Sequence, residues 1–468
     1  MNPHFLKRVV LPTWQYFKHQ NSLKLLPYLE KTQWLSPSEL LDLQWRRIGE
    51  LLEHAYEHVP YYSDVMRAIG VDPLSATGDR SLDRLPLLDR STITQQLNRL
   101  RATNIPDDRF VPNGTGGSTG EPLRFFDDHT ASGWLDAAVW RSHRWYGVDV
   151  GDRCCYLWGA NFDLTRFQGL SGRMRSRALN LLMLPAWKLS EATSDNFWKK
   201  LIDFRPKLLV AYSGAIHNWA RLLGNHRDPI PGLSAIVVSA ETLHDEWRIV
   251  IERCFKVPVY NRYGGRDLKF IAQECGARKG LHINAENVFV EILRDGQAVE
   301  PGELGEVVIT RLDNFAMPFI RYQTGDLAAF ASSACECRRS LPLLAKIEGR
   351  IQDTILTEDG RIVSGPFFAH MMKDCPDVKE FQVHQLARHQ LLIQIVLDGQ
   401  RPFLSQSRIQ RIVQEYMGHN MMIDFDLRDS IPLTRSGKRR VIVSHLSVDE
   451  QAQPAALAGS LTTGATFH

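Results

Sequence analysis

The chain has 468 residues, of which 44% are hydrophobic and 23% charged, and its formal net charge is +3. This length predicts roughly two to four domains or subdomains. The composition is typical of a soluble globular protein, and the small net charge gives no reason to expect a nucleic-acid partner or an anionic membrane. Seven cysteines and the lack of a signal-peptide pattern predict a reducing, cytoplasmic location. No run approaches the roughly 18 apolar residues that span a bilayer, so no transmembrane segment is expected.

Residues 1–100 are predicted to be a largely helical lead-in. Ser36 is placed to cap a helix that has Pro37 in its first turn. Between Leu40 and His58 apolar residues recur with a period near 3.6, which predicts an amphipathic helix. A second helix is expected at Ser91–Arg101.

A glycine-rich stretch follows at residues 113–122, with the sequence Asn-Gly-Thr-Gly-Gly-Ser-Thr-Gly-Glu-Pro. Glycine lets the backbone adopt positive φ and lets a ligand approach the amides, and the serine and threonine hydroxyls add donors. This pattern predicts a loop that binds phosphate, although a solvated Gly/Ser turn has a similar composition. It is not a Walker A loop, because Glu121 follows the last glycine where such a loop has lysine. Any cation that meets the phosphates must therefore come from another part of the chain.

Short apolar runs bounded by turn residues come next and alternate with helical segments. The runs are Cys154–Trp158, Leu208–Tyr212, Ala235–Ser239 and Pro258–Asn261, and the helices between them include Asp195–Phe204 and Glu246–Cys254. This alternation predicts an α/β fold with a largely parallel sheet. Ligands bind beyond the carboxyl ends of such strands. The loops Ser239–Glu241 and Asn261–Asp267 therefore become candidates for a site.

The remaining third of the chain has a different pattern. Residues 286–330 alternate with period 2 around turn signals, which predicts a β-rich subdomain, with strands at Val288–Leu293, Glu306–Thr310 and Phe319–Tyr322. The expected organisation is a large multi-subdomain N-terminal domain over residues 1–349 and a small, mobile α+β domain over 350–446. The tail, 447–468, is rich in Ala, Gly, Thr and Gln and is expected to be disordered.

Five motifs in order carry a resemblance to a known family. Four of them are Gly-Gly-Ser-Thr-Gly-Glu-Pro from Gly116, Tyr-Gly-Gly-Arg-Asp from Tyr263, Gly-Leu-His-Ile-Asn-Ala-Glu-Asn from Gly280 and Arg-Tyr-x-Thr-Gly-Asp from Arg321, and the fifth is the segment from Leu43 to Tyr62. Over about residues 30–446 the chain resembles the adenylate-forming (ANL) superfamily, and within it the branch of phenylacetate–CoA ligases and CapK-type proteins. The resemblance implies that a carboxylate reacts with ATP to give an acyl-adenylate and pyrophosphate, and that the acyl group then passes to coenzyme A.

The resemblance also implies roles for individual residues. Asp267 stands where the family usually has a glutamate that helps to hold Mg²⁺, and its side chain is shorter by one methylene. Lys438, in a basic run near the C-terminus, would contact the carboxylate and the α-phosphate, with the segment Arg350–Asp353 as a hinge for the small domain. In the ATP-binding set, Asp326 would bind the ribose hydroxyls, and Arg350 would contact the ribose or a phosphate. The rest of the set would be Gly116, Gly117, Ser118, Thr119 and Gly120 at the phosphates, Ala240, Glu241 and Tyr263 around the adenine, and Gly264 beside them.

The acid and the acyl acceptor stay open at this point. Candidate pocket residues are Trp158, Asn161, Tyr212 and Ser213, which suit either an aryl acid or a small polar acid. The acceptor could be coenzyme A, a carrier-protein thiol, or an amine or hydroxyl of a sugar in surface-polysaccharide biosynthesis. The Asp267 replacement leaves a catalytically silent nucleotide-binding scaffold as an alternative. Monomer and dimer are both compatible with the sequence.

A set of cysteines and one histidine predicts a metal site. Cys275 and His282 are followed later by Cys335 and Cys337. Three thiols and one imidazole suit a tetrahedral, structural Zn²⁺, and similar sets occur in parts of this family. The alternative is four ordinary reduced residues.

Overall fold

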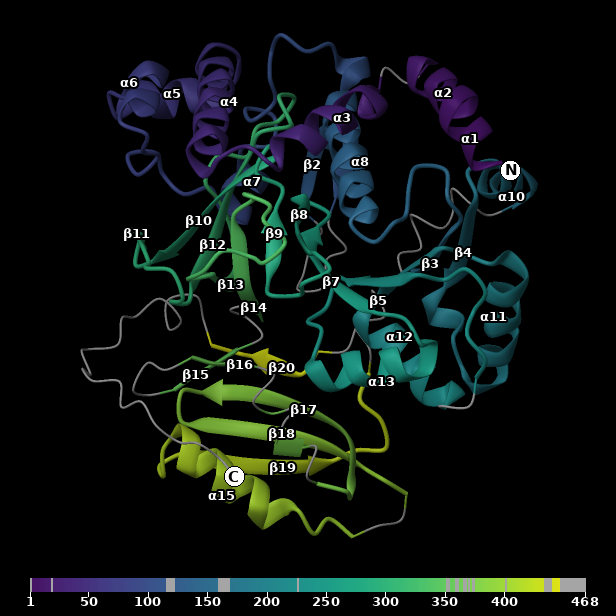
Figure 1. Cartoon of the computed structure of the whole chain (residues 1–468). Helices are drawn as coiled ribbons and strands as arrows, with labels where there is room; N and C mark the ends of the chain where they lie inside the picture. Colours follow the sequence, from purple (N-terminus) through teal and green to yellow (C-terminus); the bar gives the residue numbers. More distant parts are fainter. Residues whose placement is uncertain are drawn as a thin grey trace. The chain divides into compact units, whose positions relative to one another are not determined.

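The computed structural model describes residues 2–17, 20–114, 123–158, 169–224, 227–350, 354–357, 362–364, 368, 371–372, 375–399, 402–432 and 440–446. The chain forms two compact units, residues 1–347 and 348–468 (Figure 1). The tail predicted to be disordered lies outside the described residues. None of the described helices is long and apolar enough to cross a membrane.

The first unit contains most of the helices and strands. Its α-helices are α1 (Pro3–Phe5), α2 (Leu11–Phe17), α3 (Ser22–Thr32), α4 (Pro37–His58), α5 (Pro60–Ala68), α6 (Pro73–Gly78), α7 (Arg90–Gln95), α8 (His129–Arg144), α10 (Gly169–Ala178), α11 (Glu191–Phe204), α12 (Ser213–Leu223) and α13 (Asp245–Phe255). A π-helix spans Leu6–Val10, and short 3₁₀ helices span Asp107–Arg109 and Ala186–Lys188. Its strands, the last of which runs into the second unit, are β1 (Val111–Gly114), β2 (Arg124–Asp127), β3 (Cys154–Trp158), β4 (Leu181–Pro185), β5 (Leu208–Tyr212), β6 (Ala235–Ser239), β7 (Val259–Gly265), β8 (Lys269–Glu274), β9 (Leu281–Ile283), β10 (Val288–Arg294), β11 (Gln297–Ala298), β12 (Gly305–Arg311), β13 (Tyr322–Phe330) and β14 (Leu343–Arg350).

One sheet of 12 strands organises this unit, in the order β11-β10-β12-β13-β14-β9-β8-β7-β6-β5-β3-β4. The strands from β4 to β7 pair in parallel, and β7 and β8 pair antiparallel. The sheet therefore joins a parallel half to an antiparallel half at β7. This mixed α/β architecture confirms the predicted fold class.

The parallel half is buried on both faces. Leu209 and Ile236 pack with helices α11, α12 and α13, where Trp219 lies in the core. On the opposite face Val210 and Val237 pack with residues that follow α8. Burial of both faces explains why these strands are continuous apolar runs, and β3, β5 and β6 have the predicted bounds.

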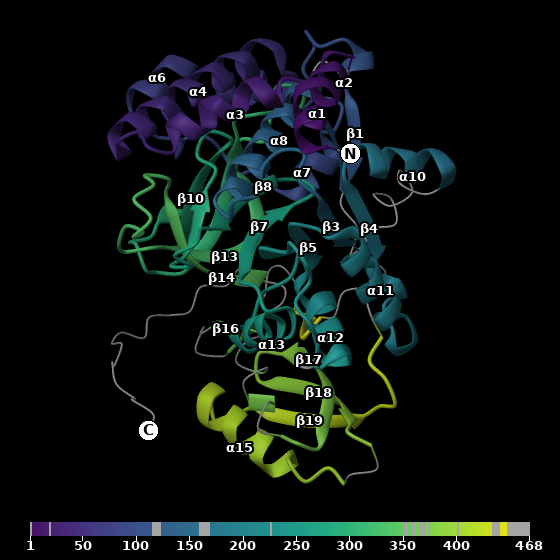
Figure 2. The same cartoon turned by 45° about the vertical axis from the view of Figure 1, so that its right-hand side comes forward.

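The antiparallel half is covered by N-terminal helices: α4 and α5 share a core with β10 and β12, and α4 lies near β10 in Figure 2. Ser36 caps α4 as predicted, because its Oγ accepts the Glu39 N–H at 3.3 Å while Glu39 Oε2 accepts the Ser36 N–H at 2.8 Å. This is a capping box. Trp45 and Ile48 of α4 share one core with Val290 of β10.

Several predicted elements differ from the structure in their bounds, and long-range contacts accompany two of these differences. The helix expected at Ser91–Arg101 is α7, which ends at Gln95, and the Arg99 carbonyl accepts a hydrogen bond from Tyr61 N. The strand expected at Phe319–Tyr322 begins only at Tyr322. Before it, the Tyr62 hydroxyl donates to the Pro318 carbonyl and accepts the Ile320 N–H. These long-range partners replace the local pairing that the sequence pattern predicts.

The second unit has its own sheet and core. Four strands lie in the order β19-β18-β17-β20, and helix α15 packs on them through Ile409 and Val413, which contact the core of Val383 and Ile393. The elements of this unit are β15 (Thr354–Leu356), β16 (Ile362–Ser364), β17 (Val378–Ala387), β18 (Gln390–Leu397), α15 (Gln406–Met417), β19 (Met422–Leu427) and β20 (Ile442–Ser444).

Candidate active site

The glycine-rich loop closes a two-stranded hairpin. Strands β1 and β2 pair antiparallel, and their last pair before the loop is Gly114 with Arg124. Helix α8 follows β2 directly, and its N-terminus is capped by Asp128, whose Oδ1 accepts the Ala131 N–H at 2.6 Å. The glycine-rich stretch is thus flanked by two paired strands, and a helix follows the second of them. The five predicted phosphate-binding residues, from Gly116 to Gly120, lie outside the described residues.

Two motifs that are far apart in the sequence meet at Tyr263 and Asp326. The Tyr263 hydroxyl donates a hydrogen bond of 2.7 Å to Asp326 Oδ2. Thr324 Oγ1 accepts the Asp326 N–H at 2.9 Å, across a bulge of β13 in which Gly325 has φ +73°. Burial, and then the neighbouring Asp326 carboxylate, raise the pKa of Tyr263, so it stays a neutral donor. This hydrogen bond fixes the position of the Tyr263 ring relative to the Asp326 carboxylate.

Asp267 is held from two sides. The Tyr322 hydroxyl donates to Asp267 Oδ2 at 3.1 Å, and Arg311 donates to the Asp267 carbonyl at 3.2 Å. The β7–β8 turn around it is close-packed, because a Cβ on Gly264 would lie 2.1 Å from the Lys269 carbonyl oxygen and one on Gly265 would lie 2.8 Å from Asp267 Oδ1. The two glycines of the Tyr-Gly-Gly-Arg-Asp motif therefore permit the close approach that places Asp267.

Glu241 and Ser213, predicted to bind adenine and acid respectively, contact each other. Glu241 Oε2 accepts the Gly214 N–H at 2.7 Å, at the first turn of α12, and Ser213 Oγ donates to the Glu241 carbonyl at 3.1 Å. Ala240, between β6 and this contact, has φ +72°. A carboxylate at a helix N-terminus is stabilised by the free N–H groups there. Glu241 therefore ties the loop after β6 to the start of α12.

Trp158 and Tyr212 form an aromatic pair at the carboxyl ends of two neighbouring parallel strands. Their ring centroids are 4.5 Å apart, and β3 and β5 pair directly. This is the edge of the sheet at which the sequence predicts a ligand. Asn161 and Lys438 lie outside the described residues. Arg350 ends β14, and its side chain is not among those described.

A buried charged cluster at the base of the β1–β2 hairpin was not predicted from the sequence. Asp127 of β2 accepts hydrogen bonds from Arg311 and Asn113, and it forms an ion pair with Lys269. The available signal was weak: Asp127, Lys269 and Arg311 belong to no motif, and Asn113 is only the first residue of the glycine-rich stretch. Only the fold brings segments this far apart in the sequence together.

A histidine next to the loop after β6 gives the protein an acid-sensitive contact. His217 of α12 stacks on Trp247 of α13, with centroids 4.8 Å apart and ring planes 7° apart. Burial, and then Arg221 and His244, lower the pKa of His217 from 6.5 to about 4. The unfolded chain therefore takes up a proton in this range before the folded chain does, and the free energy of unfolding falls as the pH drops from about 6.5 towards about 4.

We expect His217→Phe to flatten this pH dependence, because phenylalanine keeps the ring stack and does not titrate. Urea unfolding at about pH 7 and about pH 5 measures the difference for both proteins, in the range where histidine titrates. An equal loss of stability in the variant and the wild type would contradict the assignment.

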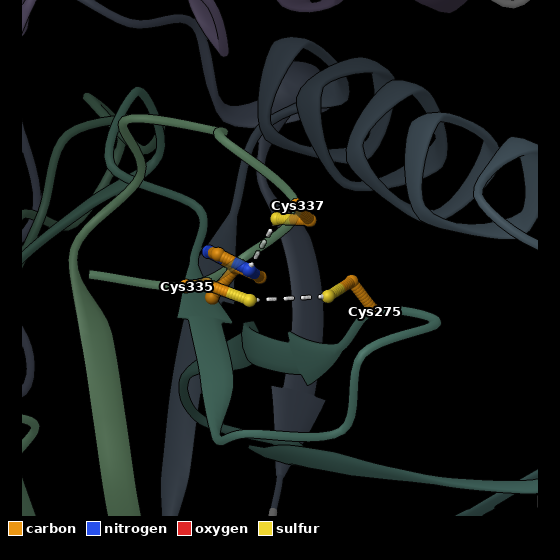
Figure 3. A group of neighbouring side chains, drawn as sticks. Cys275, Cys335 and Cys337 are labelled. Carbon is orange, nitrogen blue, oxygen red and sulfur yellow. Dashed lines mark hydrogen bonds between the residues drawn. The ribbon is translucent and has the colours of Figure 1, made fainter. Parts of the chain in front are cut away.

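The four predicted metal ligands are brought together. Cys275 follows β8, His282 lies in β9, and Cys335 and Cys337 lie between β13 and β14, with the four donor atoms within 4.8 Å of one another (Figure 3). Cys275 Sγ is 3.6 Å from Cys335 Sγ, and Cys337 Sγ is 3.2 Å from His282 Nε2.

The surroundings of His282 favour the form that binds a metal. Its Nδ1 lies 3.3 Å from the Leu341 carbonyl, so Nδ1–H can donate there and leave Nε2 free to face the sulfurs. Burial lowers the pKa of His282 to about 4, which keeps the imidazole neutral. Three thiols and a neutral imidazole, three of them buried, are a donor set that fits a closed tetrahedral Zn²⁺ site.

Comparison with known proteins shows which proteins the chain resembles. Residues 355–445 match the family model of the CapK C-terminal domain. Protein CapK of Staphylococcus aureus is 23% identical over 423 residues, which cover 87% of this chain and 90% of that protein. The phenylacetate-coenzyme A ligase of Thermus thermophilus is 25% identical over 338 residues, covering 70% of this chain and 74% of that enzyme.

Solved structures agree in fold. A 2-hydroxyisobutyryl-CoA ligase in complex with 2-HIB-AMP superimposes with a TM-score of 0.71 at 18% identity, covering 88% of this chain and 91% of that one. ATP-bound MatB from Rhodopseudomonas palustris gives a TM-score of 0.53 at 15% identity, covering 72% and 68% of the two chains. The resemblance predicted from the motifs is confirmed: the chain is similar in sequence to CapK and to the phenylacetate–CoA ligases, and it shares the fold of solved CoA ligases.

Proposed function

We propose that the protein is an AMP-forming acid–thiol ligase. It activates a carboxylic acid with ATP to an acyl-adenylate, releases pyrophosphate, and transfers the acyl group to coenzyme A. The observation that carries this proposal is the hydrogen bond between Tyr263 and Asp326, since it joins two of the motifs on which the resemblance depends. The relatives and structural neighbours named as CoA ligases support it.

The described residues have the chemistry that the nucleotide needs. Asp326, held by Tyr263, would accept hydrogen bonds from the ribose hydroxyls. Asp267 offers a carboxylate oxygen, the ligand type that Mg²⁺ prefers, and Tyr322 and Arg311 orient it. Mg²⁺ would neutralise charge on the phosphates, while Ser118, Thr119 and the loop amides grip the pyrophosphate half of ATP. Lys438 would supply the positive charge at the reacting phosphorus, and Arg350 would contact the ribose or phosphate.

The acid would bind near Trp158 and Tyr212, with Asn161 and Ser213 as polar partners. The paired rings, tilted by 44° to each other, offer an apolar aromatic surface of the kind that binds an aryl acid. Coenzyme A is the proposed acceptor. A carrier-protein thiol or a sugar amine or hydroxyl remains the alternative from the sequence.

The cluster of Cys275, His282, Cys335 and Cys337 is proposed to hold a structural Zn²⁺. All four ligand positions would come from the protein, so the ion would have no open position for a substrate. Its role would be to tie the turn after β8 to the loop between β13 and β14.

The proposal predicts ATP–pyrophosphate exchange that depends on one acid. A panel of aryl and small polar carboxylic acids, each incubated with the protein, Mg·ATP and labelled pyrophosphate, tests this. We expect exchange with one chemical class and Asp326→Asn to abolish most of it, because ribose binding fixes ATP for in-line attack. No exchange with any acid, in a protein that binds Mg·ATP, would favour the silent scaffold.

A further inference from the structure

Asp127 is the centre of a buried polar network below the glycine-rich loop. Its side chain is 3% exposed, and that of Arg311 is 1% exposed. Asp127 Oδ1 accepts a hydrogen bond from Arg311 at 2.8 Å, while Oδ2 lies 2.6 Å from Lys269 Nζ and accepts from Asn113 at 2.9 Å. One carboxylate thus binds three donors, and of these four residues only Asn113, the first residue of the glycine-rich stretch, belongs to a motif.

Two of the three donors also contact the elements that would hold ATP. Asn113 Oδ1 accepts the N–H of Gly114 at 2.9 Å, and Gly114 is the residue directly before the loop 115–122. Arg311 NH1, the same nitrogen that donates to Asp127, also donates to the Asp267 carbonyl at 3.2 Å. Asp127 therefore links the stem of the proposed phosphate loop to the main chain of the proposed Mg²⁺ ligand.

The network is charged. Burial raises the pKa of Asp127, but Arg311 and Lys269 outweigh this and lower the pKa below its ordinary range, so the carboxylate is ionised. Arg311 is held on its other side by Asp313, with Nε and Oδ1 3.0 Å apart. Charge-assisted hydrogen bonds in a buried site are strong and directional. They are suited to fix the β1–β2 hairpin relative to β7 and β8, which belong to a different sheet.

We propose that Asp127 is a positioning residue that fixes the glycine-rich loop relative to Asp267 and so couples the grip on the phosphates to the binding of Mg²⁺. This role rests on the proposed function. Such positioning matters because small displacements between groups that act on one substrate lower the reaction rate by large factors. Asn113 connects Asp127 to the stem of the loop, and Arg311 connects Asp127 to the main chain of Asp267.

Calorimetric titration of ATP without any acid, once with MgCl₂ and once with EDTA, tests the coupling. The readout is the ratio of the dissociation constant measured with EDTA to the one measured with MgCl₂, which reports how much Mg²⁺ strengthens ATP binding. In Asp127→Asn we expect Mg·ATP binding to weaken about tenfold or more and the ratio to fall, because residues that orient a metal ligand typically govern metal affinity by such factors. Asn113→Ala removes only the contact toward the loop, so both dissociation constants should rise and the ratio should fall less than in Asp127→Asn, in which Arg311 also loses its carboxylate partner.

Glu274→Gln is the matched control. Glu274 is a buried carboxylate on β8 that also binds three donors, two from Arg248 and the Asn261 N–H, and among the described residues none of these donors contacts Asp127 or Asp267. It should lower thermal stability as Asp127→Asn does and leave the Mg²⁺ ratio unchanged.

Three results would overturn the proposal. The first is a folded Asp127→Asn with the wild-type ratio, and the second is an equal loss of the ratio in Glu274→Gln. The third applies if Asp127→Asn does not fold: wild-type dissociation constants in Asn113→Ala. Wild-type protein that binds no Mg·ATP at all would overturn the proposed function, and this role with it.

Discussion

Lys438→Ala is expected to slow acyl-adenylate formation about 10²- to 10³-fold, the usual cost of removing one charge-stabilising donor from a transition state. The reason lies in the glycine-rich loop, where Glu121 stands in the place of a P-loop lysine. The attacking carboxylate and the α-phosphate are both anionic, so a cation must meet them. The resemblance assigns this task to Lys438. Acid-dependent pyrophosphate exchange measures the effect.

The transfer half of the reaction distinguishes this role from a general loss of structure. Chemically prepared acyl-adenylate and coenzyme A should react with Lys438→Ala at close to the wild-type rate, because no carboxylate attacks phosphorus in that step. Arg435→Ala, in the same basic run, is the control and should leave exchange nearly unchanged. Equal loss of both half-reactions, or equal effects of the two variants, would contradict the assignment.

Cys335→Ser is expected to remove the zinc and to lower the stability of the first unit substantially. A structural zinc site can contribute on the order of several kcal/mol to folding, because its ligands come together only in the folded chain. Elemental analysis should give about one zinc per wild-type chain and almost none in the variant, as expected for a four-ligand site that loses a ligand. Calorimetry should show a lower unfolding temperature.

Cys254→Ala provides the control for loss of a buried thiol. Cys254 lies in α13, outside the cluster, so its removal should leave the zinc content unchanged. A wild-type protein that is purified without zinc, and whose unfolding temperature does not respond to added Zn²⁺ or to a chelator, would contradict the metal site.

The elements that could be predicted are those whose pattern is local. Strands β3, β5 and β6 are short apolar runs buried on both faces, so the sequence pattern alone predicts where each of them begins and ends. Strand β4, Leu181–Pro185, was missed because it pairs only with β3 at the edge of the sheet, is mostly half-buried and follows a helix directly. The glycines Gly264 and Gly265 were assigned to a loop, whereas they end β7 and pair with Phe270 and Lys269.

The residues of the site likewise fall into those that a local motif identifies and those that only the fold brings together. Motifs identified Tyr263, Asp267 and Asp326, but their hydrogen bonds depend on where β7 and β13 lie in the sheet, which no local pattern determines. Asp127 and Arg311 have no motif at all. Each is a charged residue at the end of a strand, and only the pairing of segments 184 positions apart in the chain shows that they form one network.

The most direct test of the account is the acyl-adenylate itself. The protein is incubated with Mg·ATP and the acid that supports exchange, without coenzyme A, and the quenched mixture is analysed by mass spectrometry. The account predicts an acyl-AMP with the mass of that acid plus AMP less water, which disappears on addition of coenzyme A as the acyl-CoA forms. ATP that is bound but never converted to an acyl-AMP, with any acid or with a cell extract, would contradict it.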